Sequence, residues 1–488
     1  MSDIDIASIK KKSFSGIAAL FSRTLFLQLV AFGATFLLTI FLSPAIFGVF
    51  YVVSAVISFL GYFSDVGLAA ALIQKKDDLT REDLVTTFTI QQFLVGLVSI
   101  ISFLLSGRIA DFYRLDSAGV YLLQALIISF FLSSLKTIPS VLLERRLEFH
   151  KLVIPNILET IGFYLVAVIL AWRGFGISSF TAGVLVRAVV GLVAVYSIEP
   201  WRVGMGISKR VATRLLRFGV PFQINSFLAL IKDDLLTVFL GKVLPFTEVG
   251  YIGWAKKWAE VPLRLVMDSV VRVAFPAFSR LQQDMTLLGR AIERTLFGLS
   301  VTIFPLTVVI ATLVRPMIDV IPRYHKWEPA LLSFYLFALS SVLACLSTPL
   351  TNALNAIGKI KITLWLMVLW TSLTWVVTVL FIRLFGFHGV SAALLFIAST
   401  LVIVVALVKR IVPFSFWRSI RVPTVGVCIM GLFPLAGRVV FGNGFVWNLL
   451  AITMGGILYI VFVWRFERNT LQVIIRDMQI LLPWKQSR

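Results

Sequence analysis

The chain has 488 residues, of which 59% are hydrophobic and only 14% are charged, and its mean hydropathy is +0.95. Soluble domains average roughly 45–50% apolar and about 25% charged residues, so this composition excludes a water-soluble protein. Two cysteines and three histidines, scattered along the chain, argue against a disulfide framework and against a cysteine- or histidine-based metal site. The sequence predicts a polytopic membrane protein that needs no cofactor.

The apolar stretches predict an all-α fold of about fourteen transmembrane helices. A helix needs about 20 apolar residues to cross a hydrocarbon core of roughly 30 Å. Two of the predicted spans, the seventh and the eighth, also carry charged residues. The fourteen stretches lie near 16–42, 45–70, 84–105, 118–143, 153–171, 175–198, 219–241, 246–272, 293–314, 330–356, 362–382, 387–408, 422–441 and 444–464.

The loops between these spans divide the basic residues unequally. An even number of spans places both termini on one side, and that side carries 30 of the 45 Lys and Arg residues, against 9 on the other side. Because cytoplasmic loops are enriched in Lys and Arg, we expect both termini to be cytoplasmic. Most of the formal charge of +21 then orients the chain in its membrane, and no nucleic acid is expected as a partner.

The two halves of the chain share a weak internal repeat. Gly48 and Gly250 follow the starts of the second and eighth spans, Gly96 and Gly298 lie in the third and ninth, and each pair is 202 residues apart. Six spans per repeat give two parallel lobes, and transporters built in this way bind substrate between them. We therefore predict an N-terminal six-helix lobe (1–200), a cytoplasmic amphipathic linker (201–218), a C-terminal six-helix lobe (219–410), two additional transmembrane helices (411–465) and an interfacial tail (466–488).

Charged residues inside the eighth span gather on one face of the helix. An ionised side chain that faces lipid at the bilayer centre costs at least about 2.5–3.5 kcal/mol, so such groups normally face a protein interior or water. At about 100° per residue, six charges of this span fall within an arc of about 160°. They are Lys256, Lys257, Glu260, Arg264, Asp268 and Arg272.

Other charges reach a similar depth. In the seventh span Lys232, Asp233 and Asp234 lie about 20 Å from the cytoplasmic end, as Lys256 and Lys257 do in the eighth. In the N-terminal lobe, the sixth span carries Arg187, and Lys136 and Glu159 of the fourth and fifth spans are interpreted first as a structural pair. We expect the charges of the seventh and eighth spans and Arg187 to line a transport cavity. The alternative is that the eighth span neutralises itself, because its charges alternate in sign at i,i+4.

Five short stretches carry a family resemblance. They are FGVF at 47–50, FSDVGL at 63–68, IQKK at 73–76, LRFGVPF at 216–222 and VRVAFPAFSRLQ at 271–282. In order and spacing they are similar to the motifs of the Wzx-like polysaccharide flippases, in the multidrug/oligosaccharidyl-lipid/polysaccharide exporter superfamily. The resemblance implies two lobes in a V shape, the bacterial inner membrane and alternating access. It also implies that an undecaprenyl-diphosphate-linked oligosaccharide is translocated for O-antigen, capsule or exopolysaccharide synthesis.

This resemblance transfers no binding residue one for one, but it suggests roles for the charged face. A diphosphate would be attracted by cations, and acidic groups would balance charge or carry a coupling ion, H⁺ or Na⁺. The remaining partners would be membrane lipids and other polysaccharide assembly proteins. The predicted substrate-binding residues are Lys256, Lys257, Arg264, Lys232 and Arg187, and the balancing or coupling residues are Asp233, Asp234 and Glu260.

Three alternatives remain at this point. A flippase for a lipid-linked peptidoglycan precursor would use the same electrostatics, so only substrate assays separate it. A drug or cation antiporter would need an acidic cavity, whereas cations are prominent inside these spans. A membrane-embedded glycosyltransferase or ligase would need a large outer loop with acid and base residues. The largest outer loop, 315–329, is only about 15 residues long and offers only Asp319, His325 and Glu328, so no enzymatic activity is expected.

Overall fold

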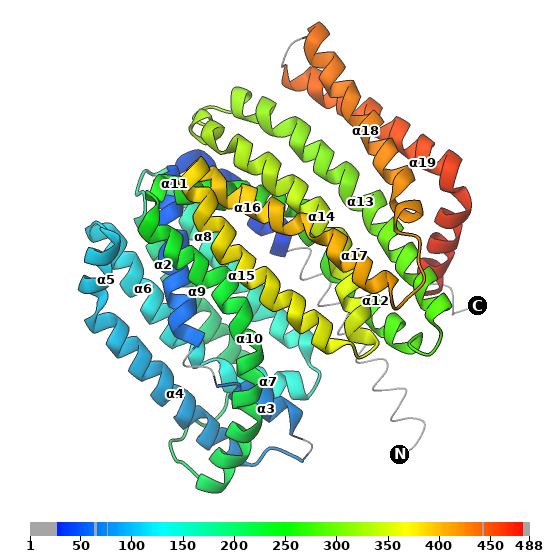
Figure 1. Cartoon of the computed structure of the whole chain (residues 1–488). Helices are drawn as coiled ribbons and strands as arrows, with labels where there is room; N and C mark the ends of the chain where they lie inside the picture. The colour runs from blue at the N-terminus through cyan, green and yellow to red at the C-terminus, as the bar shows by residue number, and fades with distance from the viewer. Residues whose placement is uncertain (1–26, 63–65, 76, 442–443, 482–488) are drawn as a thin grey trace. The chain divides into compact units, whose positions relative to one another are not determined.

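The chain is described by a computed structural model that covers residues 27–62, 66–75, 77–441 and 444–481. Within these ranges, the side chains at 221–222, 224–229, 232, 268–269, 438–441 and 473–481 lie outside the description. The described backbone forms helices and connecting turns and contains no strand (Figure 1). Two compact units result, Met1–Gly250 and Tyr251–Arg488, and each is described by itself.

The first unit contains the helices that precede α11. An apolar helix covers Leu27–Phe41. It is followed by α2 (Pro44–Tyr62), α3 (Leu68–Gln74), α4 (Arg81–Leu104), α5 (Ser106–Tyr113), α6 (Ser117–Ser134), α7 (Thr137–Arg145), α8 (Phe149–Trp172), α9 (Ser178–Ile198) and α10 (Lys209–Val243). The unit ends within α11 (Phe246–Ala259).

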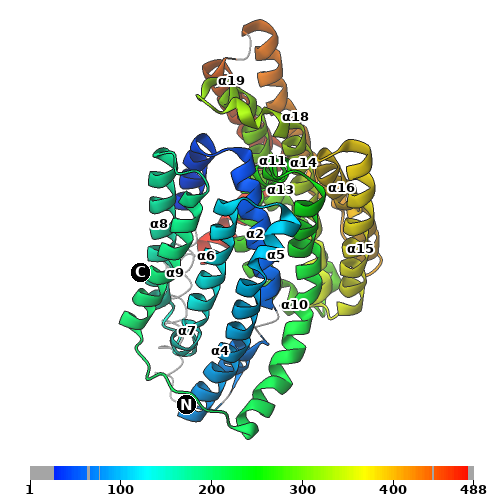
Figure 2. The same cartoon turned by 90° about the vertical axis from the view of Figure 1, so that its left-hand side faces the viewer.

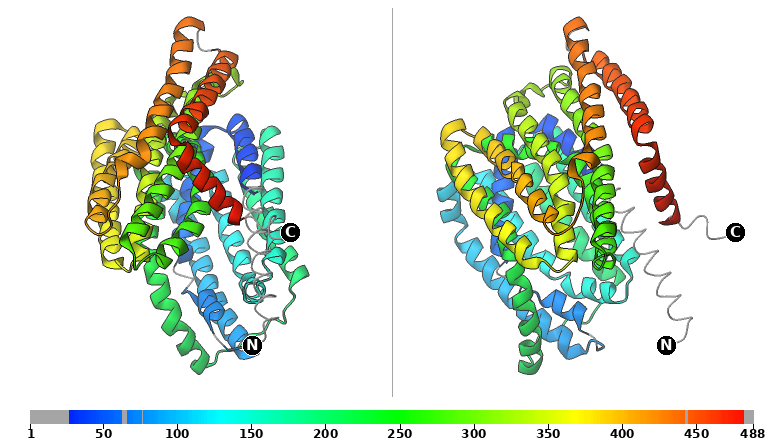
Figure 3. Two further views of the ribbon diagram at one scale, coloured as in Figure 1. Left: turned by 90° about the vertical axis from the view of Figure 1, so that its right-hand side faces the viewer. Right: turned by 45° about the vertical axis from the view of Figure 1, so that its right-hand side comes forward.

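The second unit is built around α13, a helix of 36 residues. On one side of it, Leu288, Ile292 and Leu296 join a buried apolar cluster with Leu350 and Val404. On another side, α13 packs against α18 and α19, which run beside each other (Figure 3). Its helices are α12 (Val261–Arg280), α13 (Met285–Val320), the 3-10 helix η1 (His325–Ala330), α14 (Leu331–Ala356), α15 (Ile360–Phe385), α16 (His388–Ser399), α17 (Leu401–Lys409), α18 (Phe416–Phe441) and α19 (Phe445–Leu481).

Eleven helical segments of the described chain are long and apolar enough to cross a membrane. They coincide with the predicted spans two to six and nine to fourteen, so the multi-pass membrane fold is confirmed. The first span is represented by the short helix Leu27–Phe41, because its beginning lies outside the described residues. The seventh and eighth predicted spans are helical but carry several charges each. A total of fourteen spans therefore stays a prediction.

The fourth predicted span, 118–143, is wrong as a single helix. α6 ends at Ser134, and α7 begins at Thr137. Pro139 has no N–H and cannot donate to the carbonyl of Leu135, four residues earlier. The hydroxyl of Tyr196 on α9 donates to that carbonyl instead, at 3.1 Å. A proline thus divides the span, and a neighbouring helix satisfies the backbone group that the proline releases.

The predicted linker continues into the seventh span. Residues 201–207 are not helical, Ser208 caps the next helix by accepting a hydrogen bond from the N–H of Val211, and α10 then runs for 35 residues. Val211 and Leu215 are buried in a cluster that includes Leu72 of α3 and Phe88 of α4. The apolar side of this stretch therefore packs on α3 and α4 of the same unit. Figure 2 shows the course of α10 in that unit.

Two glycines of the predicted repeat make close backbone contacts within the first unit. A Cβ atom on Gly48 would lie 1.8 Å from the carbonyl oxygen of Phe246, and one on Gly250 would lie 1.9 Å from that of Pro44. Positions 44 and 246, like 48 and 250, are separated by the repeat offset of 202 residues. The starts of α2 and α11 therefore meet through equivalent positions, where only glycine leaves room for the opposing backbone.

Candidate substrate-binding site

A buried carboxylate lies halfway along α8. Glu159 is 8% exposed, and its Oε1 accepts a hydrogen bond from Lys136 Nζ at 2.5 Å. Its Oε2 lies 3.8 Å from the Nε of Arg187 on α9. From the starts of their helices, Glu159 and Arg187 are about 15 Å and about 14 Å along the axis. The cluster therefore lies near the middle of a hydrocarbon core of roughly 30 Å.

The carboxylate fits between the helices because residue 191 is a glycine. α8 and α9 lie side by side in the first unit (Figure 2). A Cβ on Gly191 of α9 would lie 1.9 Å from Oε1 of Glu159, far inside van der Waals contact. Any larger residue at this position would displace the carboxylate from Lys136.

Within this cluster, two cations share one carboxylate, so a charge of about +1 remains. Lys136 is 16% exposed and makes the short contact, whereas Arg187 is 57% exposed and makes the long one. A separation of 3.8 Å is too long for a hydrogen bond, so the guanidinium keeps its N–H donors available on this side. Its planar fork of five donors suits phosphate oxygens. Arg187 is therefore ion-paired with Glu159 without a hydrogen bond to it, and the cluster as a whole keeps one excess positive charge that can attract an anion.

The interpretation of Lys136 and Glu159 as a buried pair is confirmed by their contact. Arg187, which the sequence offered only as a separate cation, is found in the same cluster. No spacing rule connects these residues, because they come from the junction of α6 and α7, from α8 and from α9. The sequence signal that could have supported the connection is weak: a charged residue in each of three neighbouring spans.

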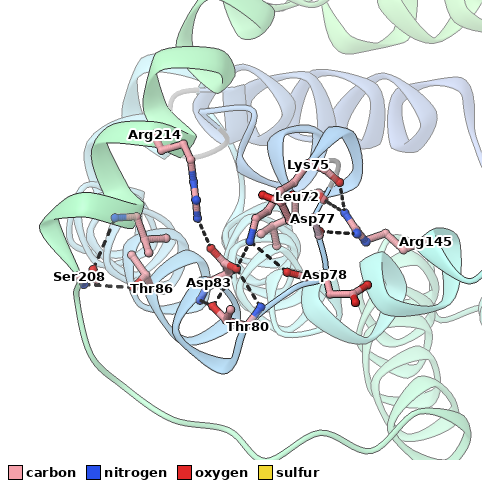
Figure 4. A network of polar contacts seen from close by, with 11 residues as sticks. Leu72, Lys75, Asp77, Asp78, Thr80, Asp83, Thr86, Arg145, Ser208 and Arg214 are labelled. Carbon is pink, nitrogen blue, oxygen red and sulfur yellow. Dashed lines mark hydrogen bonds and ion pairs between the residues drawn. The ribbon is translucent and has the colours of Figure 1, made fainter.

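A second buried carboxylate, Asp83, lies in the first turn of α4 (Figure 4). Its Oδ2 accepts a hydrogen bond from Lys75 Nζ at 2.6 Å, and its Oδ1 accepts one from Nη2 of Arg214 at 2.5 Å. Asp83 and Thr80 also form a capping box, in which each side chain accepts a hydrogen bond from the backbone N–H of the other residue. The carboxylate is completely buried and joins the end of α3, α4 and the start of α10.

Arg145 of α7 completes this network. Its guanidinium donates to the carbonyl oxygens of Leu72, Lys75 and Asp77 at 2.8, 2.6 and 2.9 Å (Figure 4). It therefore satisfies carbonyl groups that the C-terminal end of α3 leaves without helical donors. In the sequence these basic residues stand out only as loop charges. The spacing of Thr80 and Asp83 before an apolar run was the signal that could have revealed the network.

The charges of the predicted eighth span lie on two helices, so the single helix predicted over 246–272 is wrong. α11 ends at Ala259, and α12 begins at Val261. Pro262 lies in the first turn of α12 and, without an N–H, interrupts the hydrogen-bond ladder. Glu260 occupies the junction in the right-handed region, with φ −86° and ψ −3°.

Around this junction the structure shows a pairing within the segment itself. Nε and Nη2 of Arg264 donate to Oε2 of Glu260 at 3.2 and 2.7 Å. This i,i+4 pair is the self-neutralising arrangement that was the alternative to a cavity, although the Arg264 side chain stays 62% exposed. Lys256 and Lys257 are half-buried one turn earlier on α11. Their role in substrate binding stays a prediction.

The predicted charges of the seventh span lie on α10. Asp233 is exposed and Asp234 is half-buried, while the side chain of Lys232 lies outside the described residues. These residues belong to the first unit, whereas Lys256 and Lys257 belong to the second. Among the predicted site residues, Arg187 lies next to Glu159 and Arg264 is paired with Glu260. The acidic residues of α10 and the lysines of α11 belong to different units.

Comparison with known proteins identifies the family. Residues 37–332 match the family described as "Polysaccharide biosynthesis protein", which is more than half of the chain. The chain belongs to this family. The match includes the whole Asp83 network and the cluster of Lys136, Glu159 and Arg187, so both ion clusters lie in the part of the chain that defines the family.

Individual relatives within the polysaccharide biosynthesis proteins are distant. The succinoglycan biosynthesis transport protein ExoT of Rhizobium meliloti (strain 1021) is 24% identical over 326 residues, which are 66% of this chain and 65% of ExoT. The lipopolysaccharide biosynthesis protein WzxC of Escherichia coli (strain K12) is 24% identical over 320 residues, 65% of this chain and 64% of WzxC. The chain therefore spans slightly less than two thirds of either relative.

A solved structure confirms the fold class. The lipid II flippase MurJ in an inward closed conformation superposes with a TM-score of 0.76, covering 93% of this chain and 99% of MurJ at 15% identity. At such low identity the similarity establishes the fold alone. The expectation of an all-α polytopic membrane protein related to the polysaccharide transporters is confirmed by the family and the fold together.

Proposed function

We propose that this polysaccharide biosynthesis protein is a flippase that translocates an undecaprenyl-diphosphate-linked oligosaccharide for the synthesis of a surface polysaccharide. The carrier's polyprenyl tail can stay in lipid, but its diphosphate and sugars cannot cross hydrocarbon unaided. Transport by alternating access needs a polar, positively charged path and no covalent chemistry. The family and the fold support this class of activity.

The observation that carries the proposal is the excess positive charge of the cluster of Lys136, Glu159 and Arg187, in which Arg187 is too far from the carboxylate for a hydrogen bond. Charged residues near the bilayer centre are rare in membrane proteins and normally mark a substrate or ion path. Because Lys136 neutralises Glu159 at 2.5 Å, Arg187 is available to a phosphate group at the middle of α9. In this proposal Lys256, Lys257, Arg264 and Lys232 supply further positive charge, and Asp233, Asp234 and Glu260 balance it or carry a coupling ion, H⁺ or Na⁺.

The same proposal includes a location and an orientation. We place the chain in the bacterial inner membrane with both termini in the cytoplasm, because Lys and Arg are concentrated in the loops of that side. The headgroup would enter from the cytoplasmic leaflet and leave to the outer leaflet. Other polysaccharide assembly proteins would supply the lipid-linked unit and consume it.

A reconstituted system tests this function. The full chain in proteoliposomes should move a labelled undecaprenyl-diphosphate oligosaccharide to the opposite leaflet faster than protein-free vesicles do, as judged by accessibility to an added sugar-modifying reagent. Lipid II, offered in parallel, tests the peptidoglycan-precursor alternative. Transport of lipid II without transport of the oligosaccharide lipid would replace the proposal with that alternative, and no transport of either lipid would contradict both.

A further inference from the structure

The first unit contains an apolar pocket of about 440 Å³ between α2, α5 and α10. Its walls include Phe59 and Leu60 of α2, Ile109 and Tyr113 of α5, and Val238 of α10. The Tyr113 hydroxyl donates a hydrogen bond to the carbonyl of Val238 at 3.2 Å, so α5 is attached to α10 at the pocket. Ligand pockets typically measure about 300–1,000 Å³, and this volume lies within that range. Figure 2 shows α5 in front of α2 and beside α10.

Two exposed cations lie at the edge of the pocket. Arg108 of α5 forms part of its lining. Lys242 of α10 reaches the end of α5, where its Nζ donates to the carbonyl of Phe112 at 2.9 Å and lies 4.0 Å from the centre of that ring. Arg108 and Phe112 are one helical turn apart, so their side chains are neighbours about 5–6 Å apart at Cβ. In the described part of the chain, neither Arg108 nor Lys242 forms an ion pair.

The nearby charges leave this edge positive. α5 also carries Asp111, which is exposed and forms no ion pair among the described residues, and Arg114 follows at the C-terminal end of the helix. This region thus contains three basic residues, Arg108, Arg114 and Lys242, and one acidic residue, Asp111. A phosphate group near Arg108 and Lys242 would be attracted by the local charge as well as by direct contact.

The surroundings of the pocket are apolar and exposed. Ile100 and Leu104 at the end of α4 are 62% and 76% exposed, and Phe112 is 52% exposed. Since α4 is long and apolar enough to cross a membrane, these exposed side chains would lie against acyl chains in a bilayer. A molecule that fills the pocket and reaches its edge must therefore combine an apolar chain with an anionic group.

We propose that this pocket binds an anionic phospholipid, with one acyl chain among the apolar residues and its phosphate against Arg108 and Lys242. Basic side chains bind phosphate oxygens through charge-assisted hydrogen bonds, and the apolar pocket beside them suits an acyl chain. The site is separate from the Glu159 cluster and does not depend on which substrate the chain carries.

Lipid titration of the detergent-solubilised full chain, followed by native mass spectrometry, tests the proposal. Phosphatidylglycerol should bind to the unsubstituted chain at least about tenfold more tightly than phosphatidylcholine with the same acyl chains, because the choline ammonium offsets the phosphate charge and is repelled by Arg108 and Lys242. The double variant Arg108→Gln/Lys242→Gln should lose this preference. The variant Ile109→Trp, which fills the pocket and keeps both cations, should weaken the binding of both lipids.

The matched control removes two cations elsewhere. Arg173 and Arg383 are exposed at the ends of α8 and α15 and are outside the pocket lining. Arg173→Gln/Arg383→Gln should keep the preference for phosphatidylglycerol. Equal binding of the two lipids to the unsubstituted chain would overturn the proposal, as would an unchanged preference in the Arg108→Gln/Lys242→Gln variant. Retention of undecaprenyl phosphate that phosphatidylglycerol cannot displace would also overturn it, by assigning the pocket to the carrier lipid.

Discussion

Asp83 and Glu159 are two buried carboxylates of the same unit, and each has two basic neighbours, but they use the charge differently. Both oxygens of Asp83 accept short hydrogen bonds from cations, at 2.5 and 2.6 Å. Only one oxygen of Glu159 does so, and the second basic neighbour, Arg187, is 3.8 Å away. The carboxylate of Asp83, bonded to both of its cations, joins helices, whereas under the proposed function Arg187, without a hydrogen bond to Glu159, would bind the substrate.

The positions of the two clusters agree with this difference. Asp83 lies in the first turn of α4 and connects three helices at their ends, where a rigid contact stabilises the fold. Glu159 lies near the middle of α8, where a polar headgroup would need help to cross. The comparison suggests that the geometry of a buried ion cluster, more than its presence, distinguishes a structural role from a functional one.

The largest expected effect is on stability, at Asp83. Asp83→Asn leaves two basic side chains without their carboxylate, and breaking a buried pair of this kind typically costs about 3–5 kcal/mol of unfolding free energy. Thermal unfolding of the purified variant in detergent measures the loss. Asp78→Asn, which changes an exposed carboxylate of the same loop, is the control and should have little effect. Equal melting temperatures for the two variants would remove the structural role of Asp83.

A smaller loss of stability is expected at Gly191. Gly191→Ala places a methyl group against Oε1 of Glu159, and overpacking of a buried site typically costs about 1–3 kcal/mol. Gly96→Ala is the control, because no atom lies within 4 Å of the Cβ position there. Unfolding of both variants in detergent measures the difference. A Gly191→Ala protein as stable as Gly96→Ala would show that Glu159 does not need its position beside Lys136.

A modest effect on transport is expected at Arg264. Its charge is already balanced by Glu260 in an exposed i,i+4 pair, and such pairs are worth roughly 0.2–1 kcal/mol. Arg264→Gln should therefore slow translocation in proteoliposomes only by about twofold to fivefold. Complete loss of translocation with normal folding would place the main anion site on α12 and not on α9.

The smallest effect is expected at Glu148, in the turn before α8. Lys151 Nζ lies 3.0 Å from Oε2 of this carboxylate in an ion pair, which lowers the pKa of Glu148 below the usual value of a glutamate. A carboxylate whose pKa is lowered by folding stabilises the folded state at any pH above its pKa in the unfolded chain, which is about 4.3. This stabilisation is lost as the pH falls through the lower pKa of the folded state. Because the pair is partly exposed and screened by solvent, Glu148→Gln should change the unfolding free energy at pH 7 by less than about 0.5 kcal/mol. The difference in melting temperature between the unsubstituted chain and Glu148→Gln should be smaller at pH 4 than at pH 7. A larger difference at pH 4 would contradict a lowered pKa of Glu148 in the folded state.

Much of the fold could be predicted from the sequence because hydrocarbon allows few structures. An apolar stretch of sufficient length must be helical in a membrane, so eleven predicted spans reappear as helices. The interruptions were harder to place. Pro139 and Pro262 divide helices that hydropathy alone treats as continuous, since a proline changes the backbone without changing the apolar character of the stretch.

The ion clusters could be predicted only in part. Arg264 and Glu260 follow from their spacing on one helix. The cluster of Lys136, Glu159 and Arg187 depends on which helices are neighbours, and Gly191 has no signal of its own until the carboxylate beside it is known. The Asp83 network was missed because its basic residues were explained by the orientation of the chain in the membrane.

The most direct test of the account is the translocation rate of the Arg187→Gln variant, measured with its melting temperature. The side chain is 57% exposed and its contact with Glu159 is long, so the loss of stability should stay below about 1 kcal/mol. Loss of a charge-assisted contact to the diphosphate, worth about 1.5–3 kcal/mol, should reduce translocation at least about tenfold. Arg187→Lys, which keeps the charge, should recover part of the rate. Normal translocation by a well-folded Arg187→Gln protein would contradict the assignment of this residue as the anion site.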